Sequence, residues 1–216
     1  AATPPFDLEK PEPDAAAMEY HLQALFGGAP EGLIEIAWTD ASTHSLRHAQ
    51  LFEVAAIRNA VARAVKVNAK PDCNVYVGAA LRKPGTPLRK RTCDDDFFQA
   101  RAIHVDWDEP GAYETAFDRL TLDTLAPRLV VVTGCHPSIR AQGWWPWNEP
   151  IANPLTYQSI LSRFANWFGG DTTVTNPGRV MRLAGSIAWP GKKKGRIRER
   201  TSLVDHCGDF PPEEFA

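Results

Sequence analysis

The chain has 216 residues, of which 44% are hydrophobic, so it can bury the core of one good-sized domain or two small ones. Its formal net charge of −2 argues against a uniformly basic nucleic-acid-binding protein. The basic residues are instead concentrated in two runs, within residues 82–91 and 192–200, and a local basic run matters more for nucleic-acid contact than the overall sum.

The cellular location is predicted from what the sequence lacks. There is no signal peptide and no apolar run long enough to span a membrane. The four cysteines show no Cys-x-x-Cys spacing, which favours reduced thiols over a zinc site or a disulfide framework. We therefore expect a cytoplasmic protein without membrane contact. The chain lacks an initiator Met, so we also expect a domain excised from a longer protein.

The first half of the chain alternates helices with strands. Residues 1–17 are rich in Pro, Ala and Asp and predict a flexible lead-in. Apolar periodicity then predicts a helix at Met18–Phe26, a strand at Leu33–Trp38, a helix at Leu51–Ala69 and a strand at Asn74–Arg82. Asp94–Asp96 suits a helix N-terminus that continues into Phe97-Phe98.

The second half repeats this alternation. We expect a strand over residues 101–110, a helix over Ala112–Thr124, a buried strand at Leu129–Thr133, a returning strand over Ser138–Trp147, a helix over Pro154–Phe168 and a last strand at Thr201–Val204. The order predicts an α+β fold in which helices pack against a mixed or antiparallel sheet. Trp144, Trp145 and Trp147 are expected to be core residues rather than base-stacking platforms. His104 is expected to be structural, and His44 and His48 carry no functional signal.

One Asp-x-Asp pair lies inside an apolar strand pattern. Ile103, Val105 and Trp107 alternate with His104, Asp106 and Asp108, so both aspartates should point to the same face of a strand. Two such carboxylates repel each other unless water screens them, one is protonated or a cation binds between them. Mg²⁺ prefers carboxylate oxygens and often takes phosphates as its remaining ligands. The alternative is a solvated strand edge with two ordinary aspartates.

Three segments, in this order, resemble the archaeo-eukaryotic primase superfamily, and within it the primase-polymerase (prim-pol) domains of phage and plasmid replication proteins. The first is Ile103-His-Val-Asp-Trp-Asp108. The second is Thr133-Gly-Cys-His136 followed by Arg140-Ala-Gln-Gly-Trp-Trp145. The third is Asp171 followed by Arg182-Leu-Ala-Gly-Ser186 and Lys192-Lys-Lys194. Ala184 and Ala188 depart from the residues that are commoner in the family at those positions.

The resemblance implies a single catalytic domain over residues 18–216, with an N-terminal αβ unit at about 18–100 and a palm, similar to an RNA-recognition motif, at about 101–205. It implies that Asp106, Asp108 and Asp171 are catalytic and bind two divalent ions, Mg²⁺ or Mn²⁺.

The resemblance also implies nucleotide-binding and template-binding residues. Nucleotide contacts fall on Arg140, Gln142, Arg182, Lys192 and Lys193, with His136 as the alternative to Gln142 in the second motif. Template contacts fall on Arg82, Arg89 and Arg91. For Arg182 an ordinary salt bridge is the competing interpretation, and for the lysines it is a solvated loop.

The predicted function is template-dependent joining of nucleotides, by a DNA primase or DNA polymerase that releases pyrophosphate. The expected partners are single-stranded DNA template and primer, dNTP or NTP, and a helicase. A non-catalytic module that binds single-stranded nucleic acid is one alternative. Another Asp-x-Asp metal enzyme, such as a glycosyltransferase or a nuclease, is the second, although neither explains Asp171 and the segments after it.

Overall fold

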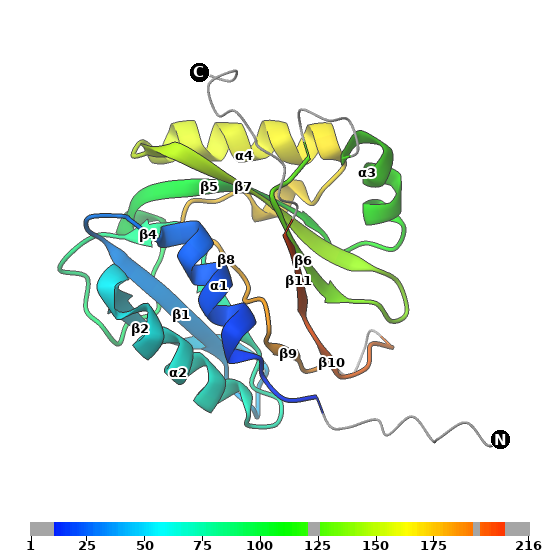
Figure 1. The fold of residues 1–216 in the computed structure, drawn as a ribbon, viewed down its shortest axis with the longest axis horizontal. Helices are drawn as coiled ribbons and strands as arrows, with labels where there is room; N and C mark the ends of the chain where they lie inside the picture. Colours follow the sequence, from blue (N-terminus) through cyan, green and yellow to red (C-terminus); the bar gives the residue numbers. More distant parts are fainter. Residues whose placement is uncertain (1–10, 121–125, 192–194, 206–216) are drawn as a thin grey trace.

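A computed structural model of the chain describes residues 11–120, 126–191 and 195–205. Its α-helices are α1 (Ala15–Phe26), α2 (Ile57–Asn68), α3 (Ala112–Leu120) and α4 (Pro154–Phe168). The longer strands are β1 (Leu33–Thr39), β2 (Leu46–Glu53), β5 (Phe97–Trp107), β6 (Leu129–Gly134) and β7 (Arg140–Ile151). The shorter strands are β3 (Val75–Gly78), β4 (Leu81–Arg82), β8 (Val180–Arg182), β9 (Ile187–Ala188), β10 (Glu199–Arg200) and β11 (Ser202–Asp205). Figure 1 shows helices lying against a long twisted sheet, so the α+β prediction is confirmed.

The main sheet is antiparallel and forks near its centre. Its order is β11-β6-β7-β5-β4-β1-β3-β8, with β2 paired to β1. Since β2 covers one edge of β1 along its whole length, β3 and β4 share the other edge. Beyond that line, β3 pairs with β8 whereas β4 pairs with β5. The sheet therefore divides into a branch that carries β8 and a branch that carries β5, β7, β6 and β11.

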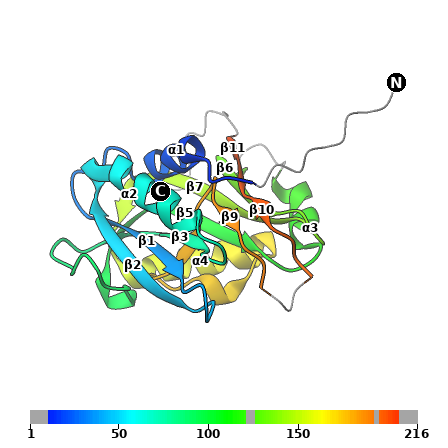
Figure 2. The same ribbon diagram turned by 90° about the horizontal axis from the view of Figure 1, so that it is seen from below.

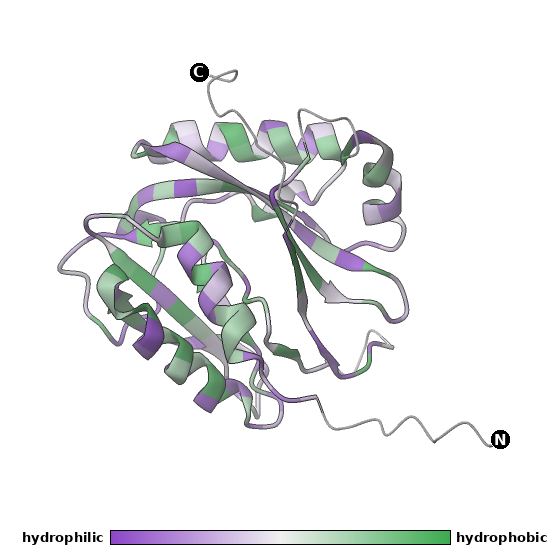
Figure 3. Ribbon diagram, viewed as in Figure 1, coloured by the Kyte–Doolittle hydropathy of each residue, from purple (hydrophilic) through white to green (hydrophobic). Residues whose placement is uncertain are grey.

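Two hydrophobic cores fix the layers. One lies under α1 and α2 and joins Leu22 and Ile34 to Leu129 and Trp144 of the β5 branch. The other lies between the opposite face of that branch and α3 and α4 (Figures 1 and 2). Figure 3 shows that α2 alternates hydrophilic and hydrophobic positions, while β1 is largely hydrophobic. In the described residues, no helix is long and apolar enough to cross a bilayer.

Several predicted elements match the structure. The helix Pro154–Phe168 is confirmed: the Asn153 side chain caps its start through bonds to Leu155 N and Thr156 N, and Gly169 ends it in the left-handed region with φ 66°. The alternation around Asp106 is confirmed as well, because Ile103, Val105 and Trp107 all lie in the α4-side core. Trp144 and Trp145 are buried core residues, as expected.

Other predicted boundaries are wrong. Leu51–Glu53 belongs to β2 and not to a helix. The strand has a weak sequence pattern, because it buries only Ala49 and Leu51 and its remaining residues are polar or partly exposed. Phe97 and Phe98 begin β5, and the helical turn before them spans only Asp94–Asp96. The lead-in is shorter than predicted, since the Asp14 carboxylate accepts a hydrogen bond from Ala17 N and α1 starts at Ala15. Residues 1–10 lie outside the described part.

Candidate active site

Asp106 and Asp108 line an open cleft of about 720 Å³ between the two branches of the sheet. Both lie at the end of β5, where the strand leaves the sheet at Trp107. Asp106 is directly opposite Gln142 of β7 in the register, and the Gln142 side chain hydrogen-bonds the Asp106 carboxyl. This wall of the cleft carries the carboxylates of the predicted first motif.

Asp171 is held next to Asp106 by a main-chain contact, although it is not among the residues that line the cleft. Its N–H donates to the carbonyl oxygen of Asp106 over 2.8 Å. The approach depends on Gly170, because a Cβ at this position would lie 2.3 Å from Cγ1 of Val105 and 3.0 Å from the Asp106 carbonyl oxygen. The main chain of a residue 65 positions further along the chain thus lies next to Asp106, while the metal-binding role of the Asp171 carboxylate stays a prediction.

The charges of these acids influence one another. The pKa of Asp106 is raised to about 6, chiefly by burial and then by the neighbouring charges of Asp108 and Asp171. The hydrogen bond from Gln142 and the positive charge of Arg179 act in the opposite direction. A carboxyl with this pKa is ionised at neutral pH at a cost in free energy, which a bound cation would lower.

The acids are partly engaged by protein groups. Asp108 forms an ion pair with Arg196 at 2.8 Å. Asp171 Oδ1 accepts bonds from Thr173 N at 2.8 Å and from Thr173 Oγ1 at 2.7 Å, which leaves Oδ2 without a hydrogen-bond donor among the described residues. Within the described ranges, no three His, Cys, Asp or Glu side chains are already arranged to hold a metal ion. Asp106 and Asp108 fit a Mg²⁺ or Mn²⁺ site of the kind that uses one or two carboxylates and takes its other ligands from phosphates.

The opposite wall of the cleft, on the β8 branch, is basic. Arg179 and Arg182 both line it. The Arg182 guanidinium donates to Asn74 Oδ1 at 2.5 Å and lies 4.6 Å from the centre of the Tyr76 ring, and the described residues include no acidic partner for it. Arg179 donates no side-chain hydrogen bond to any described residue, and its charge acts on Asp106. Arg179, Tyr76 and the cleft residue Trp189 were not singled out from the sequence. The signal that could have identified Arg179 is its place between Asp171 and Arg182 in the third segment.

The residues of the second segment separate into two groups. Gln142 lies beside Asp106, whereas His136 is exposed and is not among the residues that line the cleft. This placement favours Gln142 over His136. Arg140 lines the cleft but is 3% exposed, and its guanidinium donates to Glu199 Oε2 at 3.3 Å and to the His136 carbonyl at 2.8 Å. Arg140 therefore ties the β6–β7 turn to β10.

The predicted template role of Arg82 is wrong. Its side chain is completely buried and forms a salt bridge with Glu35 at 2.9 Å, so it cannot face a nucleic-acid backbone. Arg91 also contacts Glu35, at 2.6 Å, and keeps 25% of its side chain exposed. Arg89 is exposed, and its template role stays a prediction. Lys192 and Lys193 lie outside the described residues.

His104 has the structural role that was expected. It is buried, and burial lowers its pKa to about 4. Its Nε2 lies 3.2 Å from the Val174 carbonyl oxygen and its Nδ1 lies 3.3 Å from the Tyr157 hydroxyl. Because a carbonyl can only accept, the neutral ring carries its proton on Nε2. His104 thus links β5 to the turn that follows Asp171.

No family model and no curated protein matches this sequence. Three solved structures match its fold. Primase RepB′ aligns with a TM-score of 0.60 and 18% identity over 89% of this chain, which spans 58% of the RepB′ chain. The primase-polymerase domain of cyanophage S-2L aligns with a TM-score of 0.57 and 20% identity over 93% of this chain and 94% of its own.

The third match is the catalytic domain of primase RepB′ in complex with initiator DNA, with a TM-score of 0.60 and 18% identity over 90% of this chain and 87% of its own. At these identities the comparison concerns the fold. The chain has the fold of the archaeo-eukaryotic primase and primase-polymerase catalytic domains.

Proposed function

We propose that the chain is a template-dependent nucleotidyltransferase, a DNA primase or primase-polymerase, whose active site is the cleft between the two sheet branches. The observation that carries this proposal is the pairing of an acidic wall with a basic wall. Asp106 and Asp108 suit metal ions, while Arg179 and Arg182 suit the polyphosphate of a nucleotide. The shared fold supports the same assignment.

In the proposed reaction a 3′-hydroxyl loses its proton to water and attacks the α-phosphate of a nucleotide, the bond between the α-phosphate and the bridging oxygen of the β-phosphate breaks, and pyrophosphate leaves. Divalent ions, Mg²⁺ or Mn²⁺, would make the hydroxyl more acidic and neutralise the leaving group. Asp106, Asp108 and Asp171 would hold these ions, with Asp171 using the oxygen that Thr173 does not occupy. Phosphoryl transfer needs mainly positioning and charge from the protein, so these groups suffice without a nucleophilic side chain.

The basic wall would orient the incoming nucleotide. Arg179 has no competing acceptor among the described residues, and Arg182 is held in the cleft by Asn74 and Tyr76. Gln142 would keep the Asp106 carboxyl aimed at the cleft. Arg89 would contact the template strand, and a helicase would supply single-stranded DNA. The proposed substrates are a single-stranded DNA template and dNTP or NTP.

A template-directed synthesis assay tests this function. The chain is incubated with single-stranded DNA, with or without a primer, and with dNTPs and Mn²⁺ or Mg²⁺. We expect products whose sequence follows the template and which disappear with Asp106→Asn or Asp108→Asn. Asp95→Asn is the control, because Asp95 is an exposed acid outside the cleft.

The competing functions give different results in the same assay. Binding of single-stranded DNA without any metal-dependent product would indicate a binding module. Degradation of the template would indicate a nuclease, and transfer from a nucleotide sugar would indicate a glycosyltransferase. Template-directed synthesis that persists in both aspartate variants would contradict the assigned site.

A further inference from the structure

A buried ion pair lies at the point where the sheet forks. Glu35 of β1 and Arg82 of β4 are both completely buried, and Glu35 Oε2 accepts bonds from Arg82 Nε at 3.0 Å and from Nη2 at 2.9 Å. Thr92 and Arg91 complete the bonding of the carboxylate. Burying two charges has a desolvation cost that can exceed their attraction, so a buried ion pair is weak evidence for stability by itself. Because the pair lies where the sheet divides, it is suited to placing the chain around it.

The remaining donors of Arg82 reach across the fork to the chain that enters β8. Nη1 donates to the carbonyl of Pro177 at 3.1 Å, and Nη2 donates to the carbonyls of Gly178 at 3.0 Å and Arg179 at 3.2 Å. One guanidinium thus binds three consecutive carbonyl groups. Glu35 holds the same guanidinium from the other side and fixes its plane.

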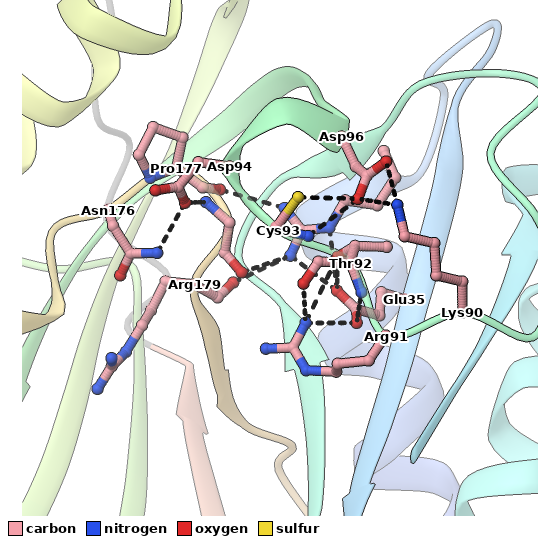
Figure 4. A network of polar contacts seen from close by, with 12 residues as sticks. Glu35, Lys90, Arg91, Thr92, Cys93, Asp94, Asp96, Asn176, Pro177 and Arg179 are labelled. Atoms are coloured by element: carbon pink, nitrogen blue, oxygen red, sulfur yellow. Dashed lines mark hydrogen bonds and ion pairs between the residues drawn. The ribbon is translucent and has the colours of Figure 1, made fainter. Parts of the chain in front are cut away.

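The same segment is held a second time, through its N–H groups. Asp94 Oδ1 accepts from Gly178 N at 2.6 Å and from the side-chain amide of Asn176 at 2.8 Å. The fit is tight, because a Cβ on Gly178 would lie 2.6 Å from that same oxygen. Figure 4 shows Asp94, Asn176, Pro177 and Arg179 of this network close together.

The held segment carries Arg179, whose side chain donates no hydrogen bond to any residue that the structure describes. In Figure 4 the main chain of Arg179 joins the network, while its side chain points away from it. Arg179 lines the cleft that contains Asp106, and its charge lowers the pKa of that carboxyl. The place of the Arg179 main chain therefore determines where its guanidinium can reach in the cleft.

We propose that Arg82, oriented by Glu35, is a positioning residue that fixes residues 177–179 so that the Arg179 guanidinium meets the polyphosphate of the incoming nucleotide. This inference rests on the proposed function. Arginine is required because its planar fork reaches Glu35 and the three carbonyls at once, with the two hydrogens of Nη2 shared among three acceptors, whereas a lysine ammonium is a single compact point charge. Arg82 itself touches no substrate.

The test compares Arg82→Lys with Thr92→Val in the full chain. Arg82→Lys keeps a positive charge beside Glu35 but loses carbonyl contacts. Thr92→Val removes a different donor from the same carboxylate and leaves the carbonyl contacts of Arg82 in place. Two quantities are measured: the Kd of a non-hydrolysable dNTP with Mn²⁺, and hydrogen exchange of a peptide that covers residues 176–181.

We expect Arg82→Lys to raise the Kd about tenfold and to speed exchange in this peptide, while Thr92→Val changes the Kd less than about twofold. In an Arg179→Ala background, Arg82→Lys should weaken binding by less than about twofold more, because the residue that it positions is gone. A purely structural role would give additive effects, and that result would overturn the proposal, as would unchanged exchange in Arg82→Lys.

The same measurements also cover two other cases: Arg82→Lys does not fold, or the unmodified chain binds no dNTP. If Arg82→Lys does not fold, Asp94→Ala replaces it, because Asp94 is exposed and holds the same segment from the solvent side. A rise of about threefold in the Kd is expected there, again absent in the Arg179→Ala background, and an additive effect rejects the positioning role. If the unmodified chain binds no dNTP, the proposed function fails, and the exchange data alone decide whether Arg82 holds the segment.

Discussion

The two walls of the cleft are built differently although they face each other. The acidic wall is part of a regular strand: Asp106 follows the alternation of β5 and pairs in register with Gln142. The basic wall is a short irregular segment followed by the three-residue strand β8, and its position depends on side-chain contacts from Arg82 and Asp94. The backbone ladder therefore places Asp106, whereas side-chain contacts from Arg82 and Asp94 place the main chain of Arg179.

This difference has consequences for mutation. Asp106 is held by the hydrogen bonds of the sheet, so its replacement acts through the chemistry of the carboxylate. A residue of the basic wall is held by a few polar contacts, so a change at a distant residue can displace it. The next experiments test each wall separately, in order of decreasing expected effect.

The largest effect is expected at the close approach of Asp171 to Asp106. Gly170→Ala places a Cβ 2.3 Å from Val105 Cγ1, so the chain must move and carry Asp171 away from Asp106. We expect nucleotide incorporation to fall at least a hundredfold and stability to fall by about 1–3 kcal/mol, the usual cost of overpacking. Rates are measured with saturating dNTP, and unfolding is followed in urea. Thr172→Ala, an exposed change in the same turn, is the control. Full activity in Gly170→Ala would show that Asp171 is not needed in the acidic wall.

A smaller effect is expected on the basic wall. Arg179→Ala removes a guanidinium that has no acceptor in the described part of the chain, so we expect the KM for dNTP to rise about tenfold to a hundredfold while the fold stays intact. Arg58→Ala is the matched control, because Arg58 is 89% exposed and pairs with Glu19 far from the cleft. Steady-state kinetics over a range of dNTP concentrations separate KM from kcat. An unchanged KM would remove Arg179 from the nucleotide site.

The smallest effect is a change in stability at the acidic wall. The folded pKa of Asp106 is raised to about 6, above the unfolded value of about 3.9, so the contribution of Asp106 to stability is fully present below about pH 4 and is lost as the pH rises through 6. Asp106→Asn mimics the protonated form, and without divalent ions it should be more stable than the unmodified chain by about 1–3 kcal/mol at pH 8. The difference should vanish near pH 4. Urea unfolding at pH 4, 6 and 8 measures it, with Asp95→Asn as the control; a difference that is independent of pH would contradict the raised pKa.

The elements that could be predicted from the sequence are those whose signals are local. The helix Pro154–Phe168 has its cap, its apolar spacing and its terminal glycines within a few residues of one another. The faces of β5 follow from a period of two. By contrast, β2 is an edge strand with only two buried residues, and its pattern merged with that of the following helix.

In the candidate site, too, only the residues with a local sequence signal could be predicted. Asp106 and Asp108 could be proposed from their strand, and Asp171 from the resemblance. The sequence could not show that Arg82 is buried while Arg179 lines the cleft, because both lie near polar, Pro- and Gly-containing segments. The burial of Arg82 depends on Glu35, a partner 47 residues away, and no local pattern records this contact.

The pairing of β8 with β3 also bears on how this protein can be divided. β8 comes more than 100 residues after β3 in the chain, yet it completes the same branch of the sheet. A recombinant fragment that ends near residue 100 would therefore lack a strand that its fold requires and would expose the open edge of β3 to self-association. Any exchange of this branch between related genes must transfer two separate stretches of coding sequence together.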